Sequence, residues 1–150
     1  MKERYLEDFK VGDRFKSEPL KVTEKQVIEF AHKFDPQMFH LNRRSAERTI
    51  FKGLIASGWH TAALLMRLYA THYLSHVASL ASPGLDELRW YKPVRPGDEL
   101  SIRVRILEAN RSRTKPDRGM VRTLVEVFNQ SGEVVMSLKA MNILLCRSPA

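Results

Sequence analysis

The chain has 150 residues, a size that suits one domain with a core of its own. Apolar residues make up 43% of the sequence and charged residues 28%, which excludes a disordered or fibrous protein. The single cysteine, Cys146, excludes an intramolecular disulfide and suits a reducing compartment. Residues 1–8 mix both charge signs and lack the apolar stretch of a signal peptide, so we expect a cytoplasmic protein.

The net charge of +8 indicates either an anionic partner or a solvated basic surface. Nucleic acid, an anionic membrane and a phosphorylated small ligand would each account for it. Nucleic-acid-binding proteins tend to concentrate basic residues on one element, whereas here they are spread along the chain. The densest stretch, residues 103–122, alternates like a strand around a turn, so a solvated sheet face is an equally good explanation. We expect neither a nucleic-acid nor a membrane partner.

The first elements are a weak strand and an amphipathic helix. Residues 15–23 have a weak strand pattern. Thr23 followed by Gln26 is a capping-box signature and predicts the start of a helix. Pro36 should end this helix, because the residue before a proline avoids the helical conformation. Asp35 should therefore lie at the end of the helix, where the chain turns.

A short and very basic helix is expected next. Asn42 and Ser45 are both candidates for its N-cap. Arg43, Arg44 and Arg48 would give this helix a strong positive charge.

Residues 57–73 predict a long central helix. Its apolar side chains occupy nearly every face, and Arg67 is its only formal charge. Such a helix should be surrounded by protein, because no single stripe would bury it. It is too polar to be a membrane span.

The second half of the chain predicts a sheet. Apolar and polar residues alternate over 100–106, and the apolar runs 121–128 and 134–145 follow. Turn signals separate these strands at 116–119 and 129–132. A buried helix followed by a long antiparallel meander predicts an α+β fold, with an antiparallel sheet wrapped around the central helix.

Four segments in this order resemble one known family: residues 5–13, 30–40, 53–58 and 89–98. The second contains an Asp followed five positions later by a His, and the third resembles the entry to a central helix. Together they resemble the MaoC-like dehydratase and (R)-specific enoyl-CoA hydratase family of the hot-dog superfamily. The resemblance implies a single hot-dog domain over residues 1–150. It also implies a homodimer or higher homo-oligomer.

The resemblance implies a lyase of fatty acid metabolism that adds or removes water at the double bond of an enoyl thioester. Coenzyme A would be part of the substrate, with acyl-carrier protein as an alternative carrier and no separate cofactor. Asp35 and His40 can hold one water and supply both proton acceptor and donor. Gly58, at the start of the central helix, offers a backbone N–H to the thioester oxygen and leaves room for close approach.

Each catalytic candidate also has a structural interpretation. Asp35 could be a turn residue, His40 a core histidine, and Gly58 a glycine that merely begins a helix. Gln37 stands where the family often has Asn, and its amide could still make a supporting hydrogen bond. Two other function classes remain open: a hot-dog thioesterase and a non-catalytic acyl-CoA-binding module.

Further substrate contacts are expected near these residues. Ser57 and Trp59 flank Gly58, and His60 could either pack in the interior or line the acyl pocket. Trp59 and Trp90 would more often be core residues than ligand platforms. With one cysteine and no suitable His spacing, no metal site is expected. Four basic residues are candidates for binding the phosphates of coenzyme A: Arg43, Arg44, Lys92 and Arg95.

Overall fold

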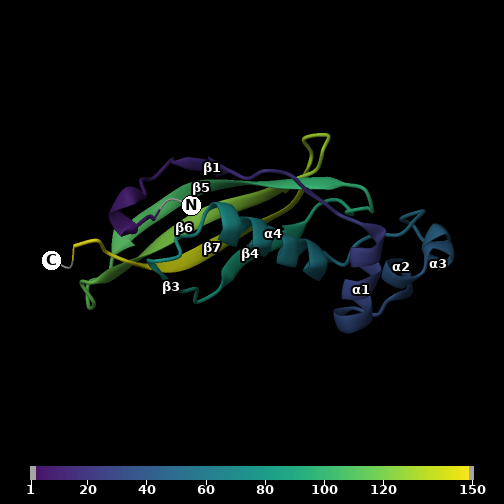
Figure 1. The fold of residues 1–150 in the computed structure, drawn as a ribbon, viewed down its shortest axis with the longest axis horizontal. Coiled ribbons are helices and arrows are strands. Elements are labelled where there is room, and N and C mark those ends of the chain that lie inside the picture. Colours follow the sequence, from purple (N-terminus) through teal and green to yellow (C-terminus); the bar gives the residue numbers. More distant parts are fainter. Residues whose placement is uncertain (1–2, 149–150) are drawn as a thin grey trace.

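The computed structural model describes residues 3–148, which form an antiparallel sheet with helix α4 against it (Figure 1). The strands are β1 (Arg14–Lys16), β2 (Leu20–Lys21), β3 (Ser79–Ala81), β4 (Leu85–Trp90), β5 (Glu99–Arg111), β6 (Arg118–Phe128) and β7 (Val134–Leu145). The helices are a 3₁₀ turn η1 (Leu6–Asp8), α1 (Glu24–Phe34), α2 (Met38–Leu41), α3 (Arg43–Glu47) and α4 (Gly58–His72).

Within the described residues, the sheet has seven strands in the order β1-β5-β6-β7-β3, with β2 also beside β5 and β4 also beside β7. All pairs are antiparallel. Helix α4 lies along the sheet, while α1, α2 and α3 cluster beyond one end of it (Figure 1). This confirms the expected α+β arrangement. No helix in residues 3–148 is long and apolar enough to cross a membrane.

The long strands follow from the alternating pattern. In β6 every second side chain is buried, which places one apolar face toward the interior. The same holds along the first half of β5. Strand β7 has the predicted bounds, but β6 begins at Arg118, inside the predicted turn. It extends that far because Arg118 and Gly119 still pair with the last residues of β7.

Helix α1 begins and ends where the local sequence indicates. The Thr23 side chain accepts a hydrogen bond from the backbone N–H of Gln26 at 3.2 Å, and the Gln26 side chain accepts one from the Thr23 N–H at 3.1 Å. Asp35 caps the other end, with its backbone N–H bonded to the Ala31 carbonyl. For α3, the Asn42 side chain accepts from the Ser45 N–H, so Asn42 is the N-cap.

One expectation about strands was wrong. Residues 15–23 do not form one strand, because Pro19 has no N–H to give to a ladder and divides β1 from β2. Strands β3 and β4 had no alternating pattern to predict them. Strand β4 lies at the sheet edge and is almost wholly exposed, with an irregular register against β7 near Glu87, whose φ is +51°.

Helix α4 was expected to be surrounded by protein, and in the single chain it is not. Trp59 is 60% exposed and Met66 is 49% exposed. Leu65, Leu68 and Tyr69 are buried, so the sheet covers one side of the helix and leaves the other open. One chain therefore supplies only part of the apolar environment that the helix sequence demands.

Candidate active site

The candidate catalytic residues meet where the end of α1, the short helix α2 and the start of α4 come together. Asp35 follows the last turn of α1, His40 lies in α2, and Gly58 begins α4. The segment that leads into α4 is held from both sides. The backbone N–H of Ile55 bonds to the carbonyl of Phe39 at 3.2 Å, and the next N–H bonds to the carbonyl of Val94 at 2.8 Å.

The Asp35 carboxylate is held by two side chains. The Ser57 hydroxyl donates to Oδ2 at 2.7 Å, and the Gln37 amide donates to Oδ1 at 2.6 Å. Partial burial opposes ionisation of Asp35, but these two hydrogen bonds and the charge of nearby His40 outweigh it. The pKa of the Asp35 carboxyl is therefore lower than usual, and the group is ionised at neutral pH.

His40 is buried and has a defined ring orientation. Its Nδ1 lies 2.7 Å from the carbonyl of Ile55, so Nδ1 must carry the proton, because a carbonyl only accepts. Its Nε2 lies 3.3 Å from Oδ2 of Asp35. If Nε2 is protonated, the two groups form an ion pair. If Nε2 is unprotonated, its lone pair and the carboxylate converge, and a water with two O–H donors would satisfy both.

Gly58 combines a free donor with a close contact. Its N–H has no hydrogen-bond partner within residues 3–148, and it lies in the first turn of α4, where the helix dipole favours negative charge. The indole of Trp90 donates to the Gly58 carbonyl at 2.9 Å. A Cβ on Gly58 would lie 2.5 Å from this ring. Trp90 thus fills the space that a side chain at this position would need, which alone requires a glycine, while Gly58 still borders the cavity described below.

A cavity of about 430 Å³ lies in front of this cluster. Asp35, His40 and Gly58 line it, and Trp59 and Trp90 form one wall with their rings at 80° to each other. Both tryptophans are exposed rather than part of the core, because the face of α4 that bears Trp59 is uncovered. Thr61 and Tyr91 also line the cavity and were not predicted. Thr61 lies one turn after Ser57, and this spacing was the available signal.

His60 lies outside the cavity. Its ring stacks on Phe30 of α1, with centroids 4.7 Å apart and planes 9° apart. Its Nδ1 has no partner in the described part of the chain, and burial lowers the pKa of the imidazole. The structure thus favours packing of His60 over the alternative of contact with an acyl group.

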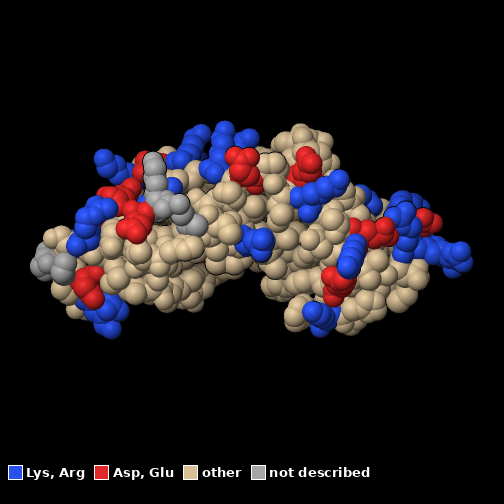
Figure 2. All heavy atoms as spheres, in the orientation of Figure 1, with Lys and Arg blue, Asp and Glu red and all other residues tan. Residues whose placement is uncertain are grey.

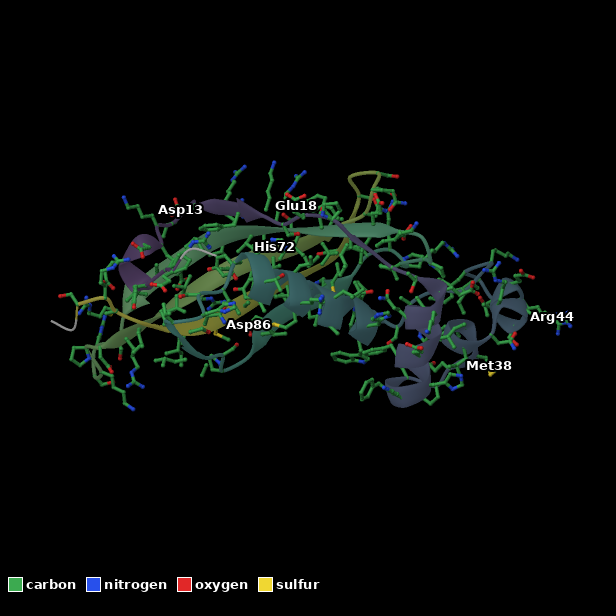
Figure 3. All side chains as sticks on the ribbon, in the orientation of Figure 1. Asp13, Glu18, Met38, Arg44, His72 and Asp86 are labelled. Atoms are coloured by element: carbon green, nitrogen blue, oxygen red, sulfur yellow. The ribbon has the colours of Figure 1, made fainter. Side chains whose placement is uncertain are left out.

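Three of the four candidate phosphate ligands are engaged by the protein. Arg43 forms two hydrogen bonds to Glu24, and Lys92 pairs with Glu133 while lining the cavity. Arg95 donates to the Phe51 carbonyl at 2.6 Å. Arg44, in the first turn of α3, points away from the rest of the molecule (Figure 3). Of the four, Lys92 alone borders the cavity.

Part of the positive charge lies on the outer face of the sheet. Arg14 pairs across strands with Arg105, and Lys16 with Arg103, which places like charges opposite each other. Within residues 3–148 none of these four residues forms an ion pair or lines the cavity. Figure 2 shows Lys and Arg side chains gathered over the edge that carries β1 and β5. This part of the charge belongs to a solvated sheet face.

Comparisons with known proteins agree with this architecture. A family model described as the MaoC like domain matches residues 8–128. YdeM of Bacillus subtilis, an uncharacterised protein, is 31% identical over 142 residues, which cover 95% of this chain and 99% of YdeM. The crystal structure of a MaoC-like dehydratase from Rhodospirillum rubrum has a TM-score of 0.90 and 41% identity, covering 97% of this chain and 99% of that one.

A further structure extends the comparison to a hydratase. The unliganded (R)-hydratase PhaJ1 from Pseudomonas aeruginosa has a TM-score of 0.76 and 28% identity, covering 96% of this chain and 86% of that one. The fold is therefore that of the hot-dog proteins, as the sequence led us to expect. The chain belongs to the MaoC-like domain family, which includes (R)-hydratases.

The hydrogen bond from Ser57 should control the ionisation of Asp35. Folding favours the ionised carboxylate of Asp35, so this group stabilises the folded protein at pH values above its ordinary pKa. The stabilisation is lost as the pH falls through the lowered pKa of the folded state. Ser57→Ala should raise the pKa of Asp35 and shrink this contribution. Carbon-13 NMR titration of the carboxyl measures the shift, with Ser131→Ala in an exposed turn as control. An Asp35 titration that is identical in both variants would contradict the assignment.

Gly58→Ala should destabilise the protein by about 1–3 kcal/mol, because the new methyl group collides with the Trp90 indole. In a chain that already carries Trp90→Leu, the same substitution should cost much less. Urea unfolding of the four proteins in this cycle measures the coupling. Equal costs in both backgrounds would show that the indole does not fill this space. If the double variant regains stability but not turnover, a glycine at position 58 is also needed for the approach of the thioester.

Proposed function

We propose that this protein hydrates the double bond of an enoyl thioester to give an (R)-3-hydroxyacyl thioester, and catalyses the reverse dehydration. The observation that carries the proposal is the ionised Asp35 beside His40 Nε2, at the N-terminal turn of α4, where the Gly58 N–H has no partner within residues 3–148. The (R)-hydratase among the structural relatives supports both the reaction class and the stereochemistry.

The pair can bind and activate one water. The carboxylate of Asp35 and the unprotonated Nε2 of His40 each accept one of its O–H groups. The water oxygen then forms a bond to the β carbon while one of its protons passes to the pair. A proton delivered from the pair to the α carbon completes the addition, so the pair returns to its starting state.

The electrons of the broken double bond move toward the thioester oxygen during this step. The unpaired N–H of Gly58 lies at the positive end of α4 and can stabilise the developing enolate. The carbonyl end of the substrate would then lie near Gly58, with the β carbon near Asp35 and His40. The cavity that these three residues share has room for this arrangement.

Loss of either member of the pair should abolish most of the activity. Asp35→Asn and His40→Ala should each lower kcat for hydration by about 10²–10⁴-fold, the range of lost acid–base catalysis. The double variant should lose little more, because the two residues act on the same water. Steady-state hydration of crotonyl-CoA, followed by loss of the conjugated double bond, measures all three.

His32→Ala, an exposed histidine of α1, serves as the matched control and should keep full activity. Wild-type turnover by either single variant would contradict the role of the pair. A thiol assay on the same reaction discriminates between function classes: release of free thiol without hydration would indicate a thioesterase. Binding of the thioester without any reaction would indicate a non-catalytic module.

Coenzyme A is the carrier that we propose, with acyl-carrier protein as the alternative. Lys92 at the cavity border is the best placed of the basic candidates to attract phosphate. Its pairing with Glu133 would have to be exchanged for the ligand.

We also propose that the protein works in the cytoplasm, where its single, buried Cys146 would stay reduced.

We further propose that the protein acts as a homodimer. The open face of α4 carries Trp59 and Met66, and in residues 3–148 strand β4 pairs only with β7. A second copy placed edge to edge would pair the free side of β4 and cover this face of the helix. Each cavity would then border both chains, since Trp59 lines it.

Sedimentation should show a species with twice the mass of the chain. Met66→Lys should shift it toward the monomer, because a charge would be buried in the apolar interface. Met38→Lys is the control, since Met38 is similarly exposed but lies on α2, beyond the end of the sheet (Figure 3). A wild-type protein that sediments as a fully active monomer would contradict the dimer.

A further inference from the structure

A polar cluster lies beneath the last turn of α4. The Tyr69 hydroxyl donates to Oδ1 of Asn142 on β7 at 2.6 Å and lies 3.1 Å from the hydroxyl of Thr123 on β6. Burial raises the pKa of Tyr69 to about 12, so the phenol keeps its proton at neutral pH. Its single proton goes to Asn142, and Thr123 can donate to the phenol oxygen in turn.

The other end of the Asn142 amide has no such partner. The residue is only 6% exposed, and within residues 3–148 its Nδ2 forms no hydrogen bond. This nitrogen is not completely buried, because Asn142 borders a groove beside α4. With Oδ1 occupied by Tyr69, the amide nitrogen is the group through which Asn142 can donate to a molecule in that groove.

Apart from Asn142, Tyr69 and Ser82, the residues that line the groove are apolar. It has a volume of about 370 Å³ and lies between α4 and the inner face of the sheet. The residues that form most of its wall are Trp59, Ala62, Met66, Leu85, Val125 and Leu138. No Lys, Arg, His, Asp or Glu of the described chain lines it. From Trp59 to Tyr69 the helix rises about 15 Å, which is the approximate length of the groove.

This groove adjoins the catalytic cavity at Trp59. Trp59 lines both, and Gly58 directly precedes it at the catalytic end. At the opposite end lie Asn142 and Tyr69. An acyl chain whose thioester lies at Gly58 would run past Trp59 along α4 and reach the amide after roughly twelve carbons in an extended conformation.

We propose that Asn142 is a specificity-determining residue that hydrogen-bonds an uncharged oxygen near the far end of the acyl chain. This inference rests on the proposed function, since it assumes that the thioester binds at Gly58. A plain alkyl end would leave the buried amide without an acceptor, which is costly. A carboxylate end would be buried without a cation, which is also unfavourable. A hydroxyl or ketone at that end satisfies the amide and meets no opposing charge.

Binding of saturated acyl thioesters tests this without requiring catalysis. Calorimetry should show that the wild-type protein binds 12-hydroxydodecanoyl-CoA about five- to tenfold more tightly than dodecanoyl-CoA, the gain expected from one satisfied hydrogen bond. Asn142→Leu, which replaces the amide with an apolar group of the same branched shape, should reverse this order. Butanoyl-CoA is too short to reach Asn142 and should bind equally to both proteins.

Melting temperatures establish that each variant is folded, and Asn142→Ser provides a second, smaller change if the leucine variant fails to fold. The serine variant should lose the preference without reversing it. Equal binding of the two dodecanoyl ligands to the wild type would overturn the inference, as expected if water occupies the amide. A preference unchanged in the folded variants would overturn it too.

Turnover of crotonyl-CoA separates this inference from the proposed function. Hydration of crotonyl-CoA together with equal binding of both dodecanoyl ligands would overturn the role of Asn142 and leave the hydratase proposal standing. The predicted binding preference without any hydration would overturn the hydratase proposal and retain the groove as an oxygenated-acyl site. If no acyl-CoA binds, both fall.

Discussion

The hydrogen bond from Ser57 to Asp35 is the contact on which the candidate site depends. Ser57 is completely buried, and its hydroxyl both donates to the carboxylate at 2.7 Å and accepts from the N–H of Trp59 at 3.2 Å. One hydroxyl therefore caps α4 and fixes the end of α1 against it. The carboxylate lies beside the positive end of α4, which also favours its ionised form. The proton acceptor, Asp35, and the oxyanion donor, the N–H of Gly58, are thus both held at the N-terminus of α4. A shift of that terminus would displace both.

Local sequence signals predicted those features that depend on near neighbours. The capping pair Thr23 and Gln26 and the proline after Asp35 set the bounds of α1, because each acts within one helical turn. The long strands β5 and β7 were predictable because one face of each is buried against the same helix. The pair formed by Asp35 and His40 was also visible, since the two residues lie only five positions apart in the sequence.

Contacts made across the fold left no comparable signal. Ser57 lies 22 residues from Asp35, and Trp90 lies 32 residues from Gly58. Gly58 was expected to be a glycine for the sake of the substrate, yet the packed indole already excludes a side chain. His60 could equally have lined the pocket; only the position of α1 turns it toward Phe30. Strands β3 and β4 escaped prediction because an exposed edge strand imposes no alternation on its sequence.

The apolar residues on every face of α4 have different neighbours, and this explains a pattern that one chain does not bury. Leu65 and Leu68 pack in the interior, whereas Ala62 and Met66 border the groove that runs toward Asn142. Trp59 borders the same groove, and the side of the helix that it shares with Met66 is open to solvent in the single chain. A helix in a monomer would place polar residues there, because they cost nothing in water and disfavour association. The sequence instead keeps this face apolar. The apolar side chains that form the groove therefore also leave α4 in need of a second protein surface to cover it. Substrate contact and assembly are in this sense properties of one helix, and a substitution on its open side would be expected to disturb both.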